Sequence, residues 1–381
     1  MKVLIVRLRL IGDVVLTTPL LHALRRRYPD ARLTYLVEPA ALPVIRGNPN
    51  LTNIVVAPKR RGLARVRDDL AIARQLRRQR FDVAIDLHGG PRAAWFTWAS
   101  RAPMRIGYAI KGRAWMYTHV IDRPADESPR ASVMNQWDLL APLDVGPPDP
   151  ARDPLEMVED ARAAASVERR LREARITPAH PIIVVHVSAG NPFRRWPRES
   201  FEALVVALAR RDPSRRIILT SGPSDASAAK AIVDGARAAL GPSAAAVPDV
   251  GEFDLAELRA LVGRAAVYIG GDSGPLHIAG TTTTPIVALL GPTLPERSMP
   301  WRDARWFAEA VDAGPLECRP CRQRECAPGD FRCLTHITAE QVAAAAERAI
   351  AGRGSGRSGA DPSGPRGEPE RHTPHREMAS S

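Results

Sequence analysis

The sequence predicts an α/β protein built from two doubly wound domains that face each other across a cleft. Two series of short apolar runs alternate with helical patterns, one in each half of the chain. Strands separated by helices of this size indicate parallel sheets covered on both faces. A proline-rich, acidic stretch, LDVGPPDPARDPLEMVED, separates the two series and is typical of a domain boundary. Ligands of such sheets bind beyond the carboxyl ends of the strands.

Each series has its own predicted elements. The first contains strands at 2–10, 32–37, 54–56 and 81–87, with helices at 19–27 and 66–79. The second contains strands within 181–190, 216–222, 265–274 and 284–293, with helices at 198–210, 226–239 and 255–264. We therefore expect a first domain over 1–160, a connecting helical segment over 161–180, a second domain over 181–350 and a disordered tail over 352–381. The tail is rich in glycine, proline and serine and too poor in apolar residues to form a core.

The charge and the apolar runs restrict the classes of partner and the location. The formal net charge of +12 favours anionic partners. Because Arg7, Arg9 and Asp13 interrupt the N-terminal apolar run, a signal peptide is not expected, and no other run approaches the ~20 residues of a membrane span. We expect a cytoplasmic protein. The basic segment PKRRGLARVR, residues 58–67, has no interleaved aromatic residues, which disfavours nucleic acid as a partner.

Two loops that follow strands of the second domain have the composition of a diphosphate site. In YIGGDSGPLHIAG, residues 268–280, small residues and a proline precede a helical run, so backbone amides are free to meet a phosphate. In HVSAGNPFRRWPRESF, residues 186–201, Ser188 supplies a hydroxyl, and Arg194 and Arg195 supply planar cations that suit phosphate oxygens. Each loop could alternatively be structural, with His277 a core histidine and the arginines solvated.

Asp13 follows the first strand, where RLRLIGDVVLTTPLL leads into a helix without a glycine-rich phosphate loop. An aspartate at this position can act as a helix N-cap. A carboxylate at the carboxyl end of a strand also points into the predicted cleft, where it could accept a proton from a hydroxyl. Dinucleotide binding is disfavoured because G-x-G-x-x-G does not occur in this stretch.

The four cysteines of the chain lie close together in CRPCRQRECAPGDFRC. Their spacing is C-x₂-C-x₄-C-x₆-C, at Cys318, Cys321, Cys326 and Cys333. Four thiols at such spacing could hold a structural zinc, whereas reduced cysteines in a surface loop are the alternative.

The motifs together resemble glycosyltransferase family 9, the bacterial heptosyltransferases of lipopolysaccharide core assembly. IGDVVLTTPLLHALRRRYPDARLTYLV, FDVAIDLHG, RIGY, NPFRRWP and GGDSGPLHIAGTTTTPIVALLGPT carry the resemblance, which covers roughly residues 1–350. It implies the GT-B fold and inverting transfer of a heptose from a nucleotide-sugar, typically ADP-heptose, to an acidic glycolipid. It also implies peripheral contact with the cytoplasmic face of the inner membrane. The implied roles are catalytic base for Asp13, donor phosphate contact for Arg194, and donor binding for Asp272, Ser273, Gly274, His277 and Asp225.

The remaining expectations concern the acceptor, the metal and the rival functions. Lys59, Arg60 and Arg61 follow a strand, and we expect them to contact the anionic acceptor. Because no D-x-D occurs in the chain, arginines rather than a bridging metal are expected to neutralise the leaving diphosphate, and catalysis is expected to need no cofactor. A different nucleotide-sugar and acceptor, or a non-catalytic nucleotide-sugar-binding protein, are the alternatives.

Overall fold

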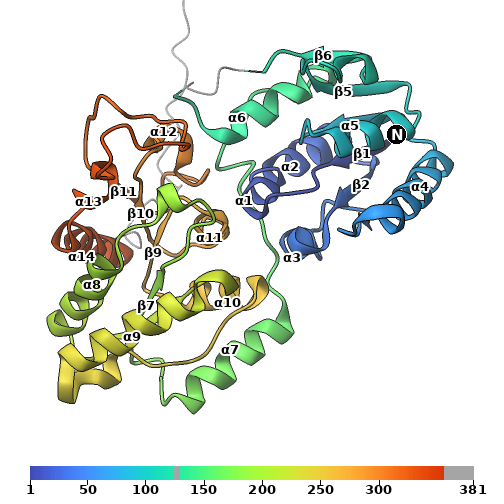
Figure 1. Ribbon diagram of the computed structural model, residues 1–381. Coiled ribbons are helices and arrows are strands. Elements are labelled where there is room, and N and C mark those ends of the chain that lie inside the picture. The colour runs from blue at the N-terminus through green and yellow to red at the C-terminus, as the bar shows by residue number, and fades with distance from the viewer. Residues whose placement is uncertain (124–128, 356–381) are drawn as a thin grey trace, which may run out of the picture.

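The computed structural model describes residues 1–123 and 129–355, which form two lobes, each with a parallel β-sheet between helices (Figure 1). The first sheet has the order β3–β2–β1–β4–β5–β6. Its strands are β1 (Lys2–Val6), β2 (Arg32–Val37), β3 (Asn53–Val56), β4 (Val83–Asp86), β5 (Met104–Tyr108) and β6 (His119–Ile121). Its α-helices are α1 (Ile11–Val15), α2 (Thr18–Arg27), α3 (Leu42–Ile45), α4 (Gly62–Gln79), α5 (Pro91–Ala99) and α6 (Ser132–Trp137).

The second sheet has the order β11–β10–β9–β7–β8, again with parallel pairing. Its strands are β7 (Ile182–His186), β8 (Arg216–Thr220), β9 (Val267–Gly271), β10 (Ile286–Leu289) and β11 (Ala308–Val311). Its α-helices are α7 (Ala161–Glu173), α8 (Arg198–Arg211), α9 (Ala226–Leu240), α10 (Leu255–Arg264), α11 (Gly274–Ala279), α12 (Pro295–Ser298), α13 (Arg332–Thr335) and α14 (Ala339–Ser355). The predicted class, two doubly wound parallel sheets, is confirmed.

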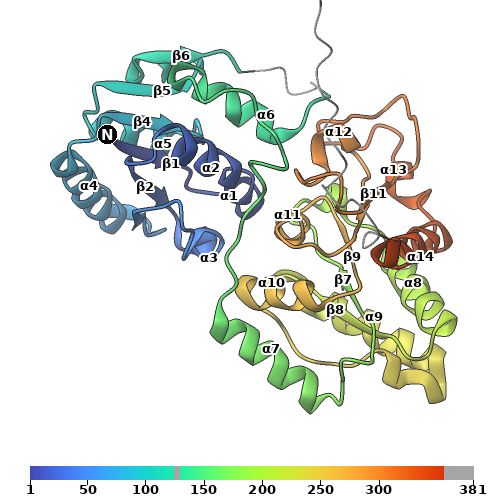
Figure 2. The ribbon, with the colours of Figure 1, turned by 180° about the vertical axis from the view of Figure 1, so that it is seen from behind.

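The strand orders locate one switch point in each sheet. The first sheet reverses its winding between β1 and β4, and the second reverses between β7 and β9. Ligands of doubly wound sheets bind in the crevice that opens at such a point. The segments that begin after Val6 and Asp86 therefore border one crevice, and those after His186 and Gly271 border the other. Figure 2 shows that α1 and α11, which follow β1 and β9, lie next to each other between the lobes.

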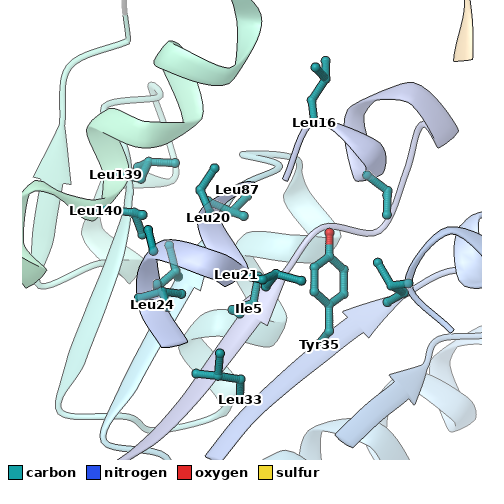
Figure 3. Packing of buried hydrophobic residues seen from close by; sticks show 14 of the residues in the cluster. Ile5, Leu16, Leu20, Leu21, Leu24, Leu33, Tyr35, Leu87, Leu139 and Leu140 are labelled. Atoms are coloured by element: carbon teal, nitrogen blue, oxygen red, sulfur yellow. The ribbon is translucent and has the colours of Figure 1, made fainter. Parts of the chain in front are cut away.

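The core beneath α2 fixes the position of the segment that follows β1. Leu20, Leu21 and Leu24 of α2 are at most 1% exposed and pack with Ile5 on the first sheet (Figure 3). Burying one such leucine contributes about 1.5–3 kcal/mol. Tyr35, fully buried in the same cluster, shares a 2.7 Å hydrogen bond with the hydroxyl of Thr17. This packing holds α2, and α1 directly before it, against the sheet.

Two predicted boundaries differ from the structure. The strand predicted for 2–10 ends at Val6, because Arg7 turns its side chain toward the carbonyl of Leu87 and the carboxylate of Asp13. The C-terminal helix α14 continues to Ser355, so residues 352–355 of the predicted tail are helical. The rest of that tail, residues 356–381, lies outside the described residues.

The segment predicted to connect the domains contains α7, which packs on α10. Val167 and Leu171 are buried in a shared cluster with Leu258 and Leu261. Arg170 forms a 3.1 Å ion pair with Glu257 across the same interface. Helix α7 is thus attached to the layer that covers the second sheet.

Candidate active site

Helices α1 and α11 meet through two glycines that bring the two lobes into contact. The Cα of Gly274 is so near Gly12 that an added Cβ on Gly12 would lie 3.1 Å from it and 3.0 Å from Cδ2 of His277. A Cβ on Gly274 would lie 3.2 Å from the backbone nitrogen of Gly12. Only glycine permits this approach of one backbone to another. The contact brings Asp13 close to the segment that begins at Asp272.

Asp13 is the third residue of α1, and Arg7 holds one of its carboxylate oxygens. The Oδ2 atom lies 2.5 Å from a guanidinium nitrogen of Arg7 and accepts a 3.3 Å hydrogen bond from the backbone N–H of Leu10. The N-cap position belongs to Leu10, so the N-cap alternative considered for Asp13 is wrong, although its carboxylate still satisfies a backbone donor of the first turn. The Asp13 side chain is 36% exposed, whereas that of Arg7 is 13% exposed.

Arg7 is a site residue that sequence reasoning missed. Besides Asp13, its guanidinium donates to the carbonyl oxygen of Leu87, which follows β4 on the other side of the switch point. Asp86, the last residue of β4, is fully buried and accepts hydrogen bonds from the N–H groups of His88 and Gly89, both at 2.8 Å. Burial raises the pKa of Asp86. The available signal was an arginine within an apolar run, four positions before the start of α1.

On the opposite side, Asp272 organises the end of β9. Its carboxylate pairs with Arg194 at 3.0 Å. It also accepts hydrogen bonds from the hydroxyls of Thr293, at 2.8 Å, and Ser298, at 3.0 Å. The Asp272 side chain is 8% exposed, so the carboxylate acts mainly on its protein neighbours. The Asp272 carboxylate thus fixes the position of the Arg194 guanidinium at the site.

Two polar atoms beside Asp272 are buried and available to a ligand. Within the described part of the chain, neither Ser273 Oγ nor His277 Nδ1 has a hydrogen-bond partner. Unpartnered buried polar atoms are rare and call for an explanation such as a bound ligand. Burial lowers the pKa of His277, against the raising influence of the Asp272 and Asp13 carboxylates. At neutral pH His277 is therefore an uncharged imidazole that can accept or donate a single hydrogen bond through Nδ1.

Arg194 is also held by a residue that the sequence analysis did not single out, Gln323. The Nε–H of Arg194 donates to Gln323 Oε1 at 2.6 Å, and the amide of Asn191 donates to the same oxygen at 2.9 Å. Gln323 lies 129 positions from Arg194 and 132 from Asn191 in sequence, on the segment that carries the cysteines. No local pattern could have indicated this contact.

The residues of both lobes border one cavity of about 680 Å³. This volume lies within the ~300–1,000 Å³ range of ligand sites. The predicted residues that line it are Asp13, Arg194, Asp272 and His277. Other residues that line it include Leu16 and Ser132 from the first lobe and Thr293, Arg297, Ser298, Arg322, Gln323 and Arg324 from the second.

Three predicted donor residues form a separate group beside this cavity. Arg195 pairs with Asp225 at 3.2 Å and donates from Nε to the carbonyl oxygen of Ala189. Ser188 Oγ accepts a 2.8 Å hydrogen bond from the N–H of Gly222. These contacts join the ends of β7 and β8. Ser188, Arg195 and Asp225 are not among the described residues that line the cavity.

The predicted acceptor residues lie on the exposed loop before α4. Lys59, Arg60 and Arg61 are all exposed, and Arg60 pairs with Asp68 at 3.2 Å. They do not border the cavity formed by the described residues around Asp13. The loop follows β3, so it lies at the same edge of the first sheet as Asp13.

The four thiols do not fit the expected zinc site. They border a second cavity of about 300 Å³ together with Phe193 and Phe331. All four are unpaired by disulfides and half-buried. No group of three or more His, Cys, Asp or Glu side chains in residues 1–123 and 129–355 is arranged to hold a metal ion. The thiols surround a cavity instead of converging on a point, and the zinc prediction is not supported.

Comparison with known proteins identifies relatives along nearly the whole chain. The sequence model of glycosyltransferase family 9 (heptosyltransferase) matches residues 70–331. Lipopolysaccharide heptosyltransferase 3 of Escherichia coli is 25% identical over 92% of this chain and 100% of its own length. The crystal structure of a family 9 glycosyltransferase from Veillonella parvula aligns with a TM-score of 0.79 at 24% identity, covering 92% of this chain and 97% of its own.

A second solved structure carries a ligand. The E. coli heptosyltransferase WaaC with ADP-2-deoxy-2-fluoro heptose aligns with a TM-score of 0.64 at 20% identity, covering 91% of this chain and 99% of its own. At these identities the two structures establish the similarity of fold.

Proposed function

The chain belongs to glycosyltransferase family 9, the heptosyltransferases, and from this premise we propose that it transfers a heptose from ADP-heptose to an acidic lipopolysaccharide-core glycolipid. The observation that carries the proposal is the single cavity bordered by Asp13 from one lobe and by Arg194 and His277 from the other. Such a cavity can hold a nucleotide-sugar against one wall and an acceptor hydroxyl against the other. The E. coli relative named as a heptosyltransferase, similar along 92% of the chain, supports this substrate class.

For the donor, we assign the diphosphate to Arg194 and the turn that follows β9. Asp272 aligns the Arg194 guanidinium, and Ser273 Oγ and His277 Nδ1 supply buried polar atoms without protein partners in the described chain. A planar guanidinium pairs with phosphate oxygens in a bidentate way. We assign the ribose and base to the neighbouring group of Ser188, Arg195 and Asp225, whose carboxylate can accept from a ribose hydroxyl. The second domain, residues 181–350, is in this proposal the donor domain.

The transfer is proposed to proceed with inversion. An acceptor hydroxyl next to Asp13 gives its proton to the carboxylate while its oxygen attacks the anomeric carbon of the heptose. The bond between that carbon and the phosphate oxygen breaks on the opposite face, and its electron pair leaves with ADP. A positioned general base accelerates such a step about 10²- to 10⁴-fold. The ion pair with Arg7 orients the Asp13 carboxylate before the transfer.

We propose that the leaving diphosphate is neutralised by side chains and not by a metal. Arg194 at the cavity, with Arg322 and Arg324 on the facing segment, supplies positive charge where the leaving group develops negative charge. Preorganised charge in a cleft of this kind lowers the barrier without reorganisation during the reaction. The sequence contains no D-x-D motif, which supports neutralisation by arginine side chains.

The acceptor is assigned to the first domain, residues 1–160, on the side of Lys59, Arg60 and Arg61. Their exposed cations suit the phosphate groups of an acidic core oligosaccharide. Such an acceptor is anchored in a lipid, so we propose that the protein works at the cytoplasmic face of the inner membrane as a peripheral protein. No helix of the described residues is both long and apolar enough to cross a bilayer.

The test is Asp13→Asn, assayed with ADP-heptose and a core oligosaccharide acceptor by mass spectrometry of the product. We expect transfer to fall about 10²- to 10⁴-fold while ADP binding, measured by calorimetry, stays within twofold. Asp234→Asn on α9, an exposed aspartate paired with Lys230, is the matched control and should retain full activity. Unchanged turnover of Asp13→Asn would refute the base assignment. A thermal-shift screen with ADP-, GDP- and UDP-sugars tests the donor separately.

A further inference from the structure

Helix α4 carries apolar side chains that the fold leaves uncovered. Leu63, Val66 and Leu70 are 88%, 54% and 41% exposed. At about 100° per residue they fall within about 60° of one another around the helix. Of the buried side chains that anchor the helix, Ile72 and Leu76 point at least about 80° away from them, and the small Ala73 lies between the two groups.

The same helix face continues with basic side chains. Helical spacing places Arg74 and Arg77 in line with the apolar residues, and both are exposed. We call Leu63, Val66, Leu70, Arg74 and Arg77 the α4 outer face. Residues 59–70 include five basic and two acidic side chains, so the surroundings of the α4 outer face carry a net positive charge.

Arg92 ties the first half of α4, and the loop before it, to the edge of the first sheet. Its guanidinium donates to Asp69 at 2.6 Å, to Glu38 at 3.0 Å and to the carbonyl oxygen of Pro58 at 2.9 Å. The three charged side chains are only 10–13% exposed. Because β3 ends at Val56, this edge is the one at which Asp13 also lies. In Figure 1 the start of α4 lies on the side of the first lobe that also carries α3.

We propose that the α4 outer face rests on an anionic lipid surface. An apolar stripe bordered by arginines suits the boundary between headgroups and acyl chains, where the apolar side chains insert and the cations meet lipid phosphates. The positive charge selects an anionic surface over a second copy of this basic chain. The identity of the partner rests on the proposed function, because a lipid-linked acceptor is presented at such a surface. A membrane held there brings the acceptor headgroup to the cleft edge.

Vesicle sedimentation with the full chain, without donor or acceptor, tests this proposal. We expect binding to vesicles of phosphatidylglycerol and phosphatidylcholine and at least tenfold weaker binding to phosphatidylcholine alone. Arg74→Glu with Arg77→Glu should weaken binding at least tenfold, because each cation near an anionic surface contributes about fivefold. Leu63→Ser with Val66→Ser and Leu70→Ser should weaken it similarly. The control, Arg162→Glu with Arg172→Glu on α7, makes the same change in net charge and should stay within twofold.

Absence of binding to the anionic vesicles, or an equal loss in the control, would overturn the proposal, and a protein partner would then be the occupant to seek. Circular dichroism verifies that each variant is folded. Transfer to a soluble core oligosaccharide should persist in the α4 variants. If vesicle binding fails while that transfer persists, the inference fails and the proposed function stands.

A second inference comes independently from the contacts of Gln323. This residue lies on the segment that follows β11, yet its amide oxygen accepts from both Arg194 and Asn191. Its backbone is in the left-handed region, with φ of 55°. A non-glycine residue adopts this conformation at a cost and only where its surroundings impose it. Arg194 is thus held from two sides, by Asp272 and by Gln323.

We infer that Gln323 is a positioning residue that orients Arg194 toward the donor diphosphate. Asp272 engages Nη1 of the guanidinium, and Gln323 engages Nε. With both in place the guanidinium plane has one orientation, which lowers the entropy lost when a phosphate binds. This inference rests on the proposed contact between Arg194 and the diphosphate.

A double-mutant cycle on ADP binding tests it. Gln323→Met keeps the length of the side chain and removes the acceptor oxygen, and we expect about tenfold weaker ADP binding. In an Arg194→Ala background the same change should cost less than twofold, because its target is absent. Equal losses in both backgrounds, or no loss in the native background, would overturn the inference. If Arg194→Ala itself leaves ADP binding unchanged, the donor assignment fails instead.

Discussion

Gly12→Ala tests whether the contact between α1 and α11 is needed for turnover. The added Cβ would lie 3.0 Å from Cδ2 of His277 and 3.1 Å from the Cα of Gly274, whereas ordinary van der Waals contact begins at 3.4 Å. One neighbour is a backbone atom, which cannot rotate away. The facing elements must therefore part by about 0.4 Å, which in a well-packed region costs about 1–3 kcal/mol.

The clash lies between two lobes, so a small separation can relieve it. We expect the free energy of unfolding to fall by no more than about 1 kcal/mol, at the lower end for overpacking. The same separation moves Asp13 away from Arg194 and His277. Since a misplacement of about 1 Å can cost 10²-fold in rate, a shift of about 0.4 Å should lower kcat about tenfold.

Steady-state transfer assays and urea denaturation measure the two effects. Gly263→Ala on α10 is the matched control, because its Cβ would lie 3.7 Å or more from any neighbour. It should leave kcat unchanged and keep or slightly raise stability. Full activity of Gly12→Ala would show that α1 and α11 need not touch during the reaction. A loss of activity that only follows unfolding would equally refute the reasoning.

Three further predictions concern stability and reactivity away from the cleft. Burial lowers the pKa of His186 from 6.5 to about 4, so the folded protein holds this imidazole neutral. Because the unfolded chain binds the proton more readily, about 3 kcal/mol of the free energy of unfolding should be lost as pH falls from 6.5 to 4. In His186→Gln the urea midpoint should depend less on pH over that range, and an unchanged pH dependence would contradict the prediction. Asp153→Ala removes a fully buried carboxylate that pairs with Arg26. It should lower the free energy of unfolding, measured in urea, by about 3 kcal/mol, at the lower end for a broken buried pair because the remaining arginine is partly solvated. A loss below about 1 kcal/mol would show that this ion pair contributes little to stability. Burial, with the other cysteines nearby, raises the pKa of Cys333 to about 11, so iodoacetamide at pH 8 should alkylate it much more slowly than a free cysteine, as peptide mapping would reveal.

The sequence predicted the repeating elements well because they depend on local patterns. The apolar run 81–87 became β4 and the helical pattern 226–239 became α9, since burial on one or two faces requires those periods. The strand that begins at Lys2 was predicted too long. Its end is set by Arg7, whose partners Leu87 and Asp13 become neighbours only in the folded chain.

The candidate site divides in the same way. Asp13, Arg194 and His277 could be selected because each follows a strand of a predicted parallel sheet. Gln323 could not be selected, because a glutamine in an irregular segment has no pattern that indicates a partner 129 positions away. The cysteine spacing was compatible with zinc, and only the arrangement of the four thiols around a cavity counted against it.

The sequence by itself determined two doubly wound sheets and the edge at which each would bind a ligand, because hydrophobic periodicity and the alternation of strands with helices are written in local patterns. Only the tertiary structure decided that the two edges meet. That meeting depends on a backbone approach at Gly12 and Gly274, two glycines 262 positions apart that no periodicity connects. The same approach brings the carboxylate of one lobe to the cationic wall of the other.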